Sequence, residues 1–171
     1  MTGDGTATLL TEARSHQAAG RIPQAEQLYR QIIARDGRNA EAWAALGAIA
    51  LMRRNEDAAA AFFAKAITFD ERNARHHVDL ALVLERQGRL QDAAGRLQQA
   101  LAIEPGSAEA HGTLGRVYGR SGNLASAALS FERALAIEPD NPGTRYNLGL
   151  AFERQGRLDE ALTHYEQART L

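Results

Sequence analysis

Five histidines are the side chains of this sequence that could bind a metal or transfer a proton near neutral pH. They are His16, His76, His77, His111 and His164. His77 and His111 lie one 34-residue interval apart, and His76 and His77 are neighbours that point to different sides of a helix. The sequence contains no cysteine, no Ser–His–acid trio that spacing supports and no phosphate-binding glycine loop. We therefore expect no metal, no cofactor and no enzymatic activity.

The overall composition also limits the partners. The 171 residues carry a formal net charge of -1, so nothing attracts the chain to nucleic acid or to anionic membranes. Residues 1–8 lack the basic start and apolar run of a secretory signal, and no stretch approaches the roughly 18 apolar residues that cross a bilayer. We expect a cytoplasmic protein with no nucleic-acid or membrane partner. All basic residues except Lys65 are arginine, which suggests a bacterial, GC-rich genome.

A 34-residue period organises nearly the whole chain. One alanine recurs at this interval, and a leucine or aromatic residue follows it four positions later. The alanines are Ala25, Ala59, Ala93, Ala127 and Ala161, and the large residues are Tyr29, Phe63, Leu97, Phe131 and Tyr165. We expect five copies, at 6–39, 40–73, 74–107, 108–141 and 142–171, which form a single repeat domain over 6–171. Residues 1–5 are expected to form a flexible N-terminus.

Each copy contains two stretches in which apolar or small residues recur at helical spacing. A glycine column separates the two stretches, where a left-handed conformation would end the first helix. Its members are Gly20, Gly88, Gly122 and Gly156. The second copy has Arg54 in this column, followed by Asn55. Either Arg54 takes the strained conformation, or Asn55 ends the helix one residue later. Pro105 and Pro139 are expected to end second helices.

These columns resemble the tetratricopeptide repeat family. The matching residues are Trp43, Leu46, Gly47, Ala59, Phe63 and Ala66 in the second copy, and Leu114, Gly115, Tyr118, Ala127, Phe131, Ala134 and Pro139 in the fourth. The resemblance implies an all-α, right-handed superhelical solenoid of antiparallel helix pairs. Its first helices would line a concave groove that binds a protein or peptide. Later copies hold His77, His111 and Arg145 in the Trp43 column, so we expect that column to be only partly buried.

The implied groove carries several arginines. Arg86, Arg120 and Arg154 occupy one groove position in three successive copies. Since a guanidinium pairs with both oxygens of a carboxylate, we hypothesise a preference for acidic or carboxylate-bearing segments. Alternatively, neighbouring acids make this row a solvated face with internal ion pairs. The groove candidates are Arg14, Arg75, Asp79, Arg86, Arg116, Arg120, Asn147 and Arg154.

The second helix of the fifth copy offers a separate candidate surface. An apolar end face is expected at Ala161, Leu162, Tyr165 and Ala168. It is covered by a following segment of a longer protein, used for homo-oligomerisation, or simply tolerated in solvent. The leading function is a non-enzymatic protein- or peptide-binding scaffold. The alternatives are a substrate-docking or regulatory module of a larger bacterial enzyme of the glycosyl- or sulfotransferase type, and a self-assembling structural repeat protein.

Overall fold

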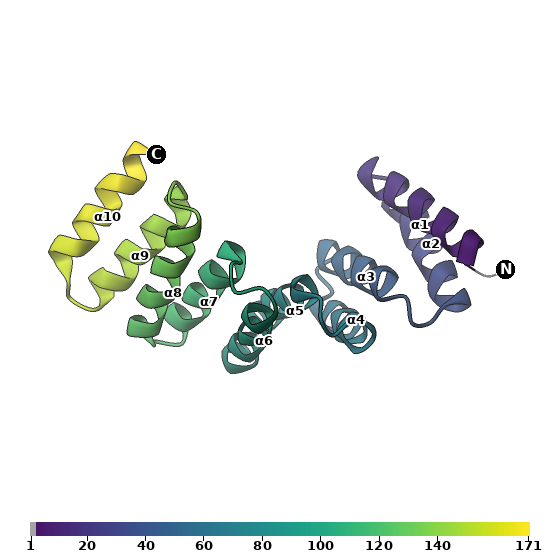
Figure 1. The fold of residues 1–171 in the computed structure, drawn as a ribbon, viewed down its shortest axis with the longest axis horizontal. Coiled ribbons are helices and arrows are strands. Elements are labelled where there is room, and N and C mark those ends of the chain that lie inside the picture. The colour runs from purple at the N-terminus through teal and green to yellow at the C-terminus, as the bar shows by residue number, and fades with distance from the viewer. Residues whose placement is uncertain (1–2) are drawn as a thin grey trace. The chain divides into compact units, whose positions relative to one another are not determined.

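The computed structural model describes the backbone of residues 3–171 and the side chains from residue 5 onward (Figure 1). Within that range the chain forms ten α-helices and no strand, which confirms the all-α prediction. The helices are α1 (Gly3–Ala18), α2 (Ile22–Arg35), α3 (Ala40–Met52), α4 (Glu56–Phe69), α5 (Ala74–Arg86), α6 (Leu90–Ile103), α7 (Ala108–Arg120), α8 (Leu124–Ile137), α9 (Pro142–Arg154) and α10 (Leu158–Thr170).

The chain divides into two compact units, Met1–Val83 and Leu84–Leu171. The helices pair within each unit: α1 packs on α2 and α3 on α4 in the first, and α7 on α8 and α9 on α10 in the second. The first helices α3, α5, α7 and α9 begin at the residues where the period places the copy boundaries. Of the N-terminal segment expected to be flexible, residues 1 and 2 lie outside the described residues, and α1 already includes Gly3.

The two helices of a copy approach closely where a glycine faces a ring. A Cβ atom added to Gly115 would lie 2.7 Å from the Phe131 ring, and one added to Gly149 would lie 2.7 Å from the Tyr165 ring. Real Cβ contacts are longer, so glycine is what allows these rings to lie flat against the first helix. Phe131 is 4 % exposed and Ala127 is fully buried, so both side chains belong to the core.

The turns between paired helices follow the predicted glycine column. Gly20, Gly88, Gly122 and Gly156 all have positive φ, between +72° and +82°. Arg54 occupies the same conformation with φ +59°, which settles the alternative left open by the sequence. Asn55 instead caps α4, where its side-chain oxygen accepts a hydrogen bond from the Ala58 amide.

The turns between copies are held by a recurring hydrogen bond. One side chain near the start of α3, α5, α7 and α9 donates an N–H to the backbone carbonyl six residues earlier. The pairs are Trp43 with Gly37 (2.9 Å), His77 with Glu71 (3.0 Å), His111 with Pro105 (3.1 Å) and Arg145 with Pro139. A carbonyl only accepts, so both histidines carry their proton on Nε2. The prediction of partial burial was wrong for His77 and His111, which are 4 % and 8 % exposed. The bond satisfies Nε2 of each ring, whereas the buried Nδ1 has no partner among the described residues.

Candidate functional site

The groove candidates of the first unit are already paired. Arg14 on α1 donates from Nε and Nη2 to the two carboxylate oxygens of Glu41 on α3, both at 2.5 Å. Arg75 and Asp79 lie one turn apart on α5 and form a 2.9 Å ion pair. The exposed fractions of the arginine side chains are 60 % in both cases, so these pairs lie in solvent and contribute little to stability.

In the second unit, a buried carboxylate forms ion pairs with two of the candidate arginines. The Glu85 side chain, near the end of α5, is 7 % exposed. Arg116 donates from Nε to Oε1 at 2.9 Å and from Nη2 to Oε2 at 2.7 Å, and Arg120 Nη1 lies 3.2 Å from Oε1. Burial raises the pKa of Glu85, but the hydrogen bonds and positive charges of the two arginines outweigh it and leave the pKa below its ordinary value. Glu85 is one of the acids next to the arginine row, and its burial was not predicted from the sequence.

The predicted arginine row has a second role in the structure. Arg120 Nη1 also donates to the Glu85 carbonyl at 2.9 Å, and Arg154 Nη1 donates to the Gly119 carbonyl at 2.8 Å. Each arginine thus reaches back 35 residues to the last turn of the preceding first helix. A cation at that position satisfies a terminal carbonyl and complements the helix dipole. Arg86 is exposed, and no ion pair or hydrogen bond of its side chain occurs among the described residues.

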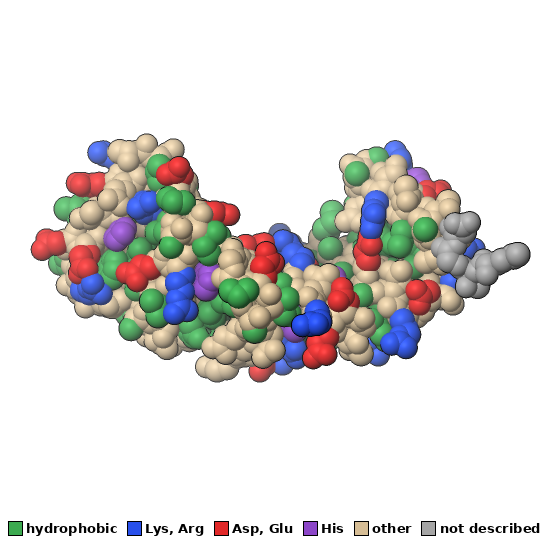
Figure 2. Space-filling view, in the orientation of Figure 1, with side chains coloured by type: hydrophobic (Ala, Val, Ile, Leu, Met, Phe, Trp, Pro, Cys, Tyr) green, Lys and Arg blue, Asp and Glu red, His purple; other side chains and the backbone are tan. Residues whose placement is uncertain are grey.

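The arginine row is therefore partly a structural feature and partly an open surface. The side chains of Arg116 and Arg120 remain 45 % and 47 % exposed despite their contacts, and Arg154 is exposed as well. On α9, the groove candidate Asn147 is half-buried, and Leu150 on the same helix is 39 % exposed. Internal ion pairs and free guanidinium N–H groups thus exist side by side on the first helices of this unit. On the face drawn in Figure 2, cationic and anionic side chains are likewise interspersed.

The end-face candidates differ in orientation. Ala161 is 2 % exposed because it packs against α9, whereas Leu162 is 57 % exposed and Tyr165 and Ala168 are half-buried. The Tyr165 hydroxyl donates a hydrogen bond to Glu153 on α9. Partial burial, together with this carboxylate, raises the pKa of Tyr165 to about 12. The exposed apolar surface of α10 is thus formed mainly by Leu158, which is 64 % exposed, and Leu162.

The described residues lack a membrane-spanning helix and a cluster of metal ligands. None of their helices combines the length and the apolar character needed to span a bilayer. Their histidine, aspartate and glutamate side chains form no group of three or more that could hold a metal ion.

Comparison with known proteins places the chain in a family. The tetratricopeptide repeat model matches residues 10–74, 69–108, 78–142 and 113–171. Among solved structures, MamA is 25% identical with a TM-score of 0.87, and the match covers 92% of each chain. PilF of Pseudomonas aeruginosa is 22% identical with a TM-score of 0.86, covering 99% of this chain and 77% of that one. YrrB, described as a TPR protein with an unusual peptide-binding site, is 21% identical with a TM-score of 0.82, covering 94% and 82%. No curated protein sequence matches. The repeated family matches, over copies that fold as paired helices, show that this chain belongs to the tetratricopeptide repeat family.

Proposed function

We propose that this chain is a non-enzymatic scaffold that binds an extended segment of a partner protein along the exposed faces of its first helices. Family membership supports a binding role, and the description of YrrB gives a related fold with a peptide site. The observation that carries the proposal is the state of the arginines in the second unit. Arg120 and Arg154 are fixed at one end by contacts to backbone carbonyls, while much of each guanidinium stays exposed.

The charge on these helices favours an acidic segment. In the second unit, the first-helix residues 84–86, 108–120 and 142–154 carry five arginines and three acids. The arginines are Arg86, Arg116, Arg120, Arg145 and Arg154, and the acids are Glu85, Glu109 and Glu153. Each guanidinium has five N–H donors, and Arg154 uses one of them for the Gly119 carbonyl. The remaining donors are oriented in advance, so a peptide carboxylate would order little additional side chain on binding.

An acidic probe peptide tests this proposal. A fluorescein-labelled peptide with alternating Glu and Gly is titrated by anisotropy against the wild-type chain and against Arg86→Glu/Arg154→Glu. These two arginines are chosen because neither contacts the Glu85 carboxylate. We expect salt-sensitive binding that the double variant loses, while Arg169→Glu on α10 serves as the matched control. Equal affinity of wild type and double variant would refute the preference for acidic segments.

Self-association is the second candidate, and the exposed apolar side chains of α9 and α10 favour it. Tyr146, Leu158 and Leu162 are 54 %, 64 % and 57 % exposed. The outer face of α1 instead presents the exposed polar residues Thr8 and Glu12, so a contact between α10 and α1 of another copy would bury a carboxylate against leucine. A symmetric α10-to-α10 contact is the arrangement that we propose. Sedimentation at rising concentrations should show a dimer that Leu162→Glu abolishes, and a strict monomer at high concentration would exclude it.

A further inference from the structure

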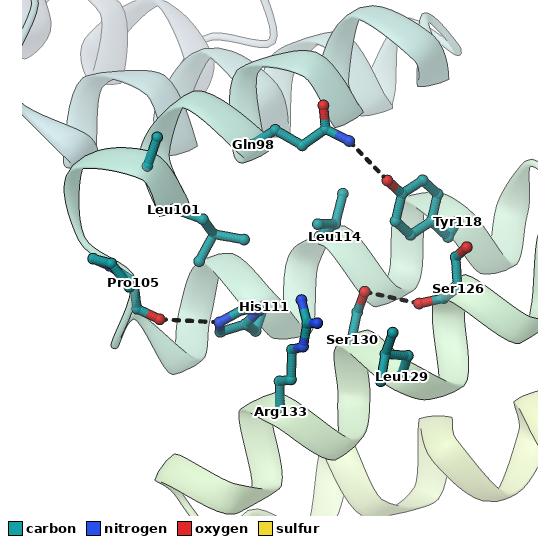
Figure 3. A pocket seen from close by; sticks show the side chains of 11 residues that line it. Gln98, Leu101, Pro105, His111, Leu114, Tyr118, Ser126, Leu129, Ser130 and Arg133 are labelled. Atoms are coloured by element: carbon teal, nitrogen blue, oxygen red, sulfur yellow. Dashed lines mark hydrogen bonds between the residues drawn. The ribbon is translucent and has the colours of Figure 1, made fainter.

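A pocket lies between the second helices α6 and α8, above the first helix α7 (Figure 3). Its volume is about 570 Å³, within the range of protein sites for small ligands and side chains. The wall is mostly apolar, with Leu101 from α6, Leu114 from α7 and Leu129 from α8. Leu129 is 49 % exposed, so much of this apolar side chain is accessible at the pocket. We call this site the α6–α8 pocket.

One small residue keeps this pocket open. Ser130 lines it, and the equivalent positions of the other four copies hold larger side chains: Leu28, Phe62, Arg96 and His164. Phe62 packs on Trp43, with ring centroids 5.8 Å apart, and His164 stacks on Phe152 at 5.4 Å. In these two copies a ring therefore occupies the space that is empty beside Ser130. The hollow beside Ser130 therefore does not follow from the repeat as such.

Several polar groups of the pocket make hydrogen bonds, but the buried Nδ1 atom of His111 and the Arg133 guanidinium have no partner among the described residues. Ser130 Oγ donates to the Ser126 carbonyl at 2.8 Å, and His111 Nε2 donates to the Pro105 carbonyl at 3.1 Å. Arg133 is the single charged side chain among the described residues that line the pocket, and it is exposed. Figure 3 shows it extending from α8 into the space between His111 and Ser130. No ion pair holds this guanidinium among the residues that the structure describes.

We propose that the α6–α8 pocket binds a segment of a partner protein in which large apolar side chains are followed by an acidic residue. The apolar side chains enter between Leu101, Leu114 and Leu129, and the acidic side chain pairs with Arg133. An apolar wall with one unpaired cation at its rim is complementary to that combination of side chains. The site lies on α6, α7 and α8, away from the Arg86 and Arg154 side chains, so it is independent of the arginine surface proposed above.

Two matched peptides test the proposal on the intact chain. The probes are acetylated and amidated Gly-Leu-Leu-Glu-Gly and Gly-Leu-Leu-Gln-Gly, and binding is followed by ¹H–¹⁵N correlation spectra, which suit an 18.6 kDa protein. We expect saturable shifts at amides of α6–α8, and about threefold tighter binding of the glutamate peptide at low salt, as for an exposed ion pair. Arg133→Gln should remove the threefold difference, whereas Arg169→Gln on α10 should keep it.

The second test fills the pocket with a larger side chain or removes apolar surface from its wall. Ser130→Phe places at this position the residue that the second copy carries at 62, so the repeat accommodates it, and it should abolish the shifts for both peptides. Leu129→Thr, which copies residue 163 of the fifth copy, should weaken both peptides several-fold without changing the core. Unchanged binding by Ser130→Phe would overturn the proposal, as would the absence of saturable shifts. Shifts that map to α9 and vanish with Arg154→Glu would also overturn it, while leaving the arginine surface intact.

Discussion

Replacing Glu85 with glutamine tests whether the buried carboxylate holds α5 and α7 together. The side chain accepts two short hydrogen bonds from Arg116 and a longer one from Arg120. Glutamine is nearly isosteric, but it removes the charge and turns an amide N–H toward two guanidinium groups. The two cations then lie side by side without their anion.

The size of the effect follows from the contacts. Hydrogen bonds to a charged group contribute about 1.5–3 kcal/mol each. The arginine side chains are 45 % and 47 % exposed, so water screens part of each interaction. We expect Glu85→Gln to lower the free energy of unfolding by about 2–3 kcal/mol at pH 7, less than the loss of a fully buried ion pair.

The pH dependence supplies an independent test. Because the pKa of Glu85 is lowered in the folded state, its stabilisation is complete above the unfolded pKa of about 4.3 and is lost as the pH falls through the folded value. The difference between wild type and variant should therefore be full at pH 7 and shrink below about pH 4. Urea unfolding followed by circular dichroism at both pH values measures it, with Glu166→Gln as the exposed control. Two results would refute the reasoning. One is a difference at pH 7 below about 0.5 kcal/mol, which is about the error of such fits, and the other is a difference that persists undiminished at pH 3.

Three further changes test the packing and the turns, all by thermal unfolding. Trp43→Phe keeps an aromatic ring but removes the donor to the Gly37 carbonyl. We expect the free energy of unfolding to fall by about 1 kcal/mol, which lowers Tm by about 2–4 °C. An unchanged Tm would show that this bond is not stabilising. Gly115→Ala adds a Cβ atom 2.7 Å from the Phe131 ring and should lower the free energy of unfolding by about 1–3 kcal/mol. Adding Phe131→Leu should restore part of this stability. Equal losses in the single and double variants would contradict the clash. Arg54→Gly relieves a left-handed arginine with φ +59° and should stabilise by about 1 kcal/mol, whereas a lower Tm would mean that the arginine makes compensating contacts.

The fold was predictable because the interactions that define it are local. The glycine turns, the cap of α4 and the first-helix starts each depend on residues within a few positions of one another. The period then repeats this local information five times. Arg54 shows the limit, because two neighbouring residues could each have ended α3, and only the structure distinguishes them.

The candidate site was less predictable because its contacts cross between copies. Glu85 and Arg116 are 31 residues apart, and nothing in either residue's neighbours indicates that the carboxylate is buried. The α6–α8 pocket depends on the absence of a ring at residue 130, which becomes visible only when that column is compared across copies. The burial of Ala161 and the exposure of Leu162 likewise depend on how α10 is rotated against α9.

The donor that closes each turn between copies has a consequence for how such a chain changes in length. Tryptophan, histidine and arginine differ in size and charge, yet each reaches the same carbonyl six residues earlier. The identity of the side chain is therefore free to vary, while the number of residues in the connection is not. One inserted amino acid would move the acceptor out of reach, whereas the duplication of a full 34-residue unit would leave every bond in place. Growth of the array is thus easiest in whole units.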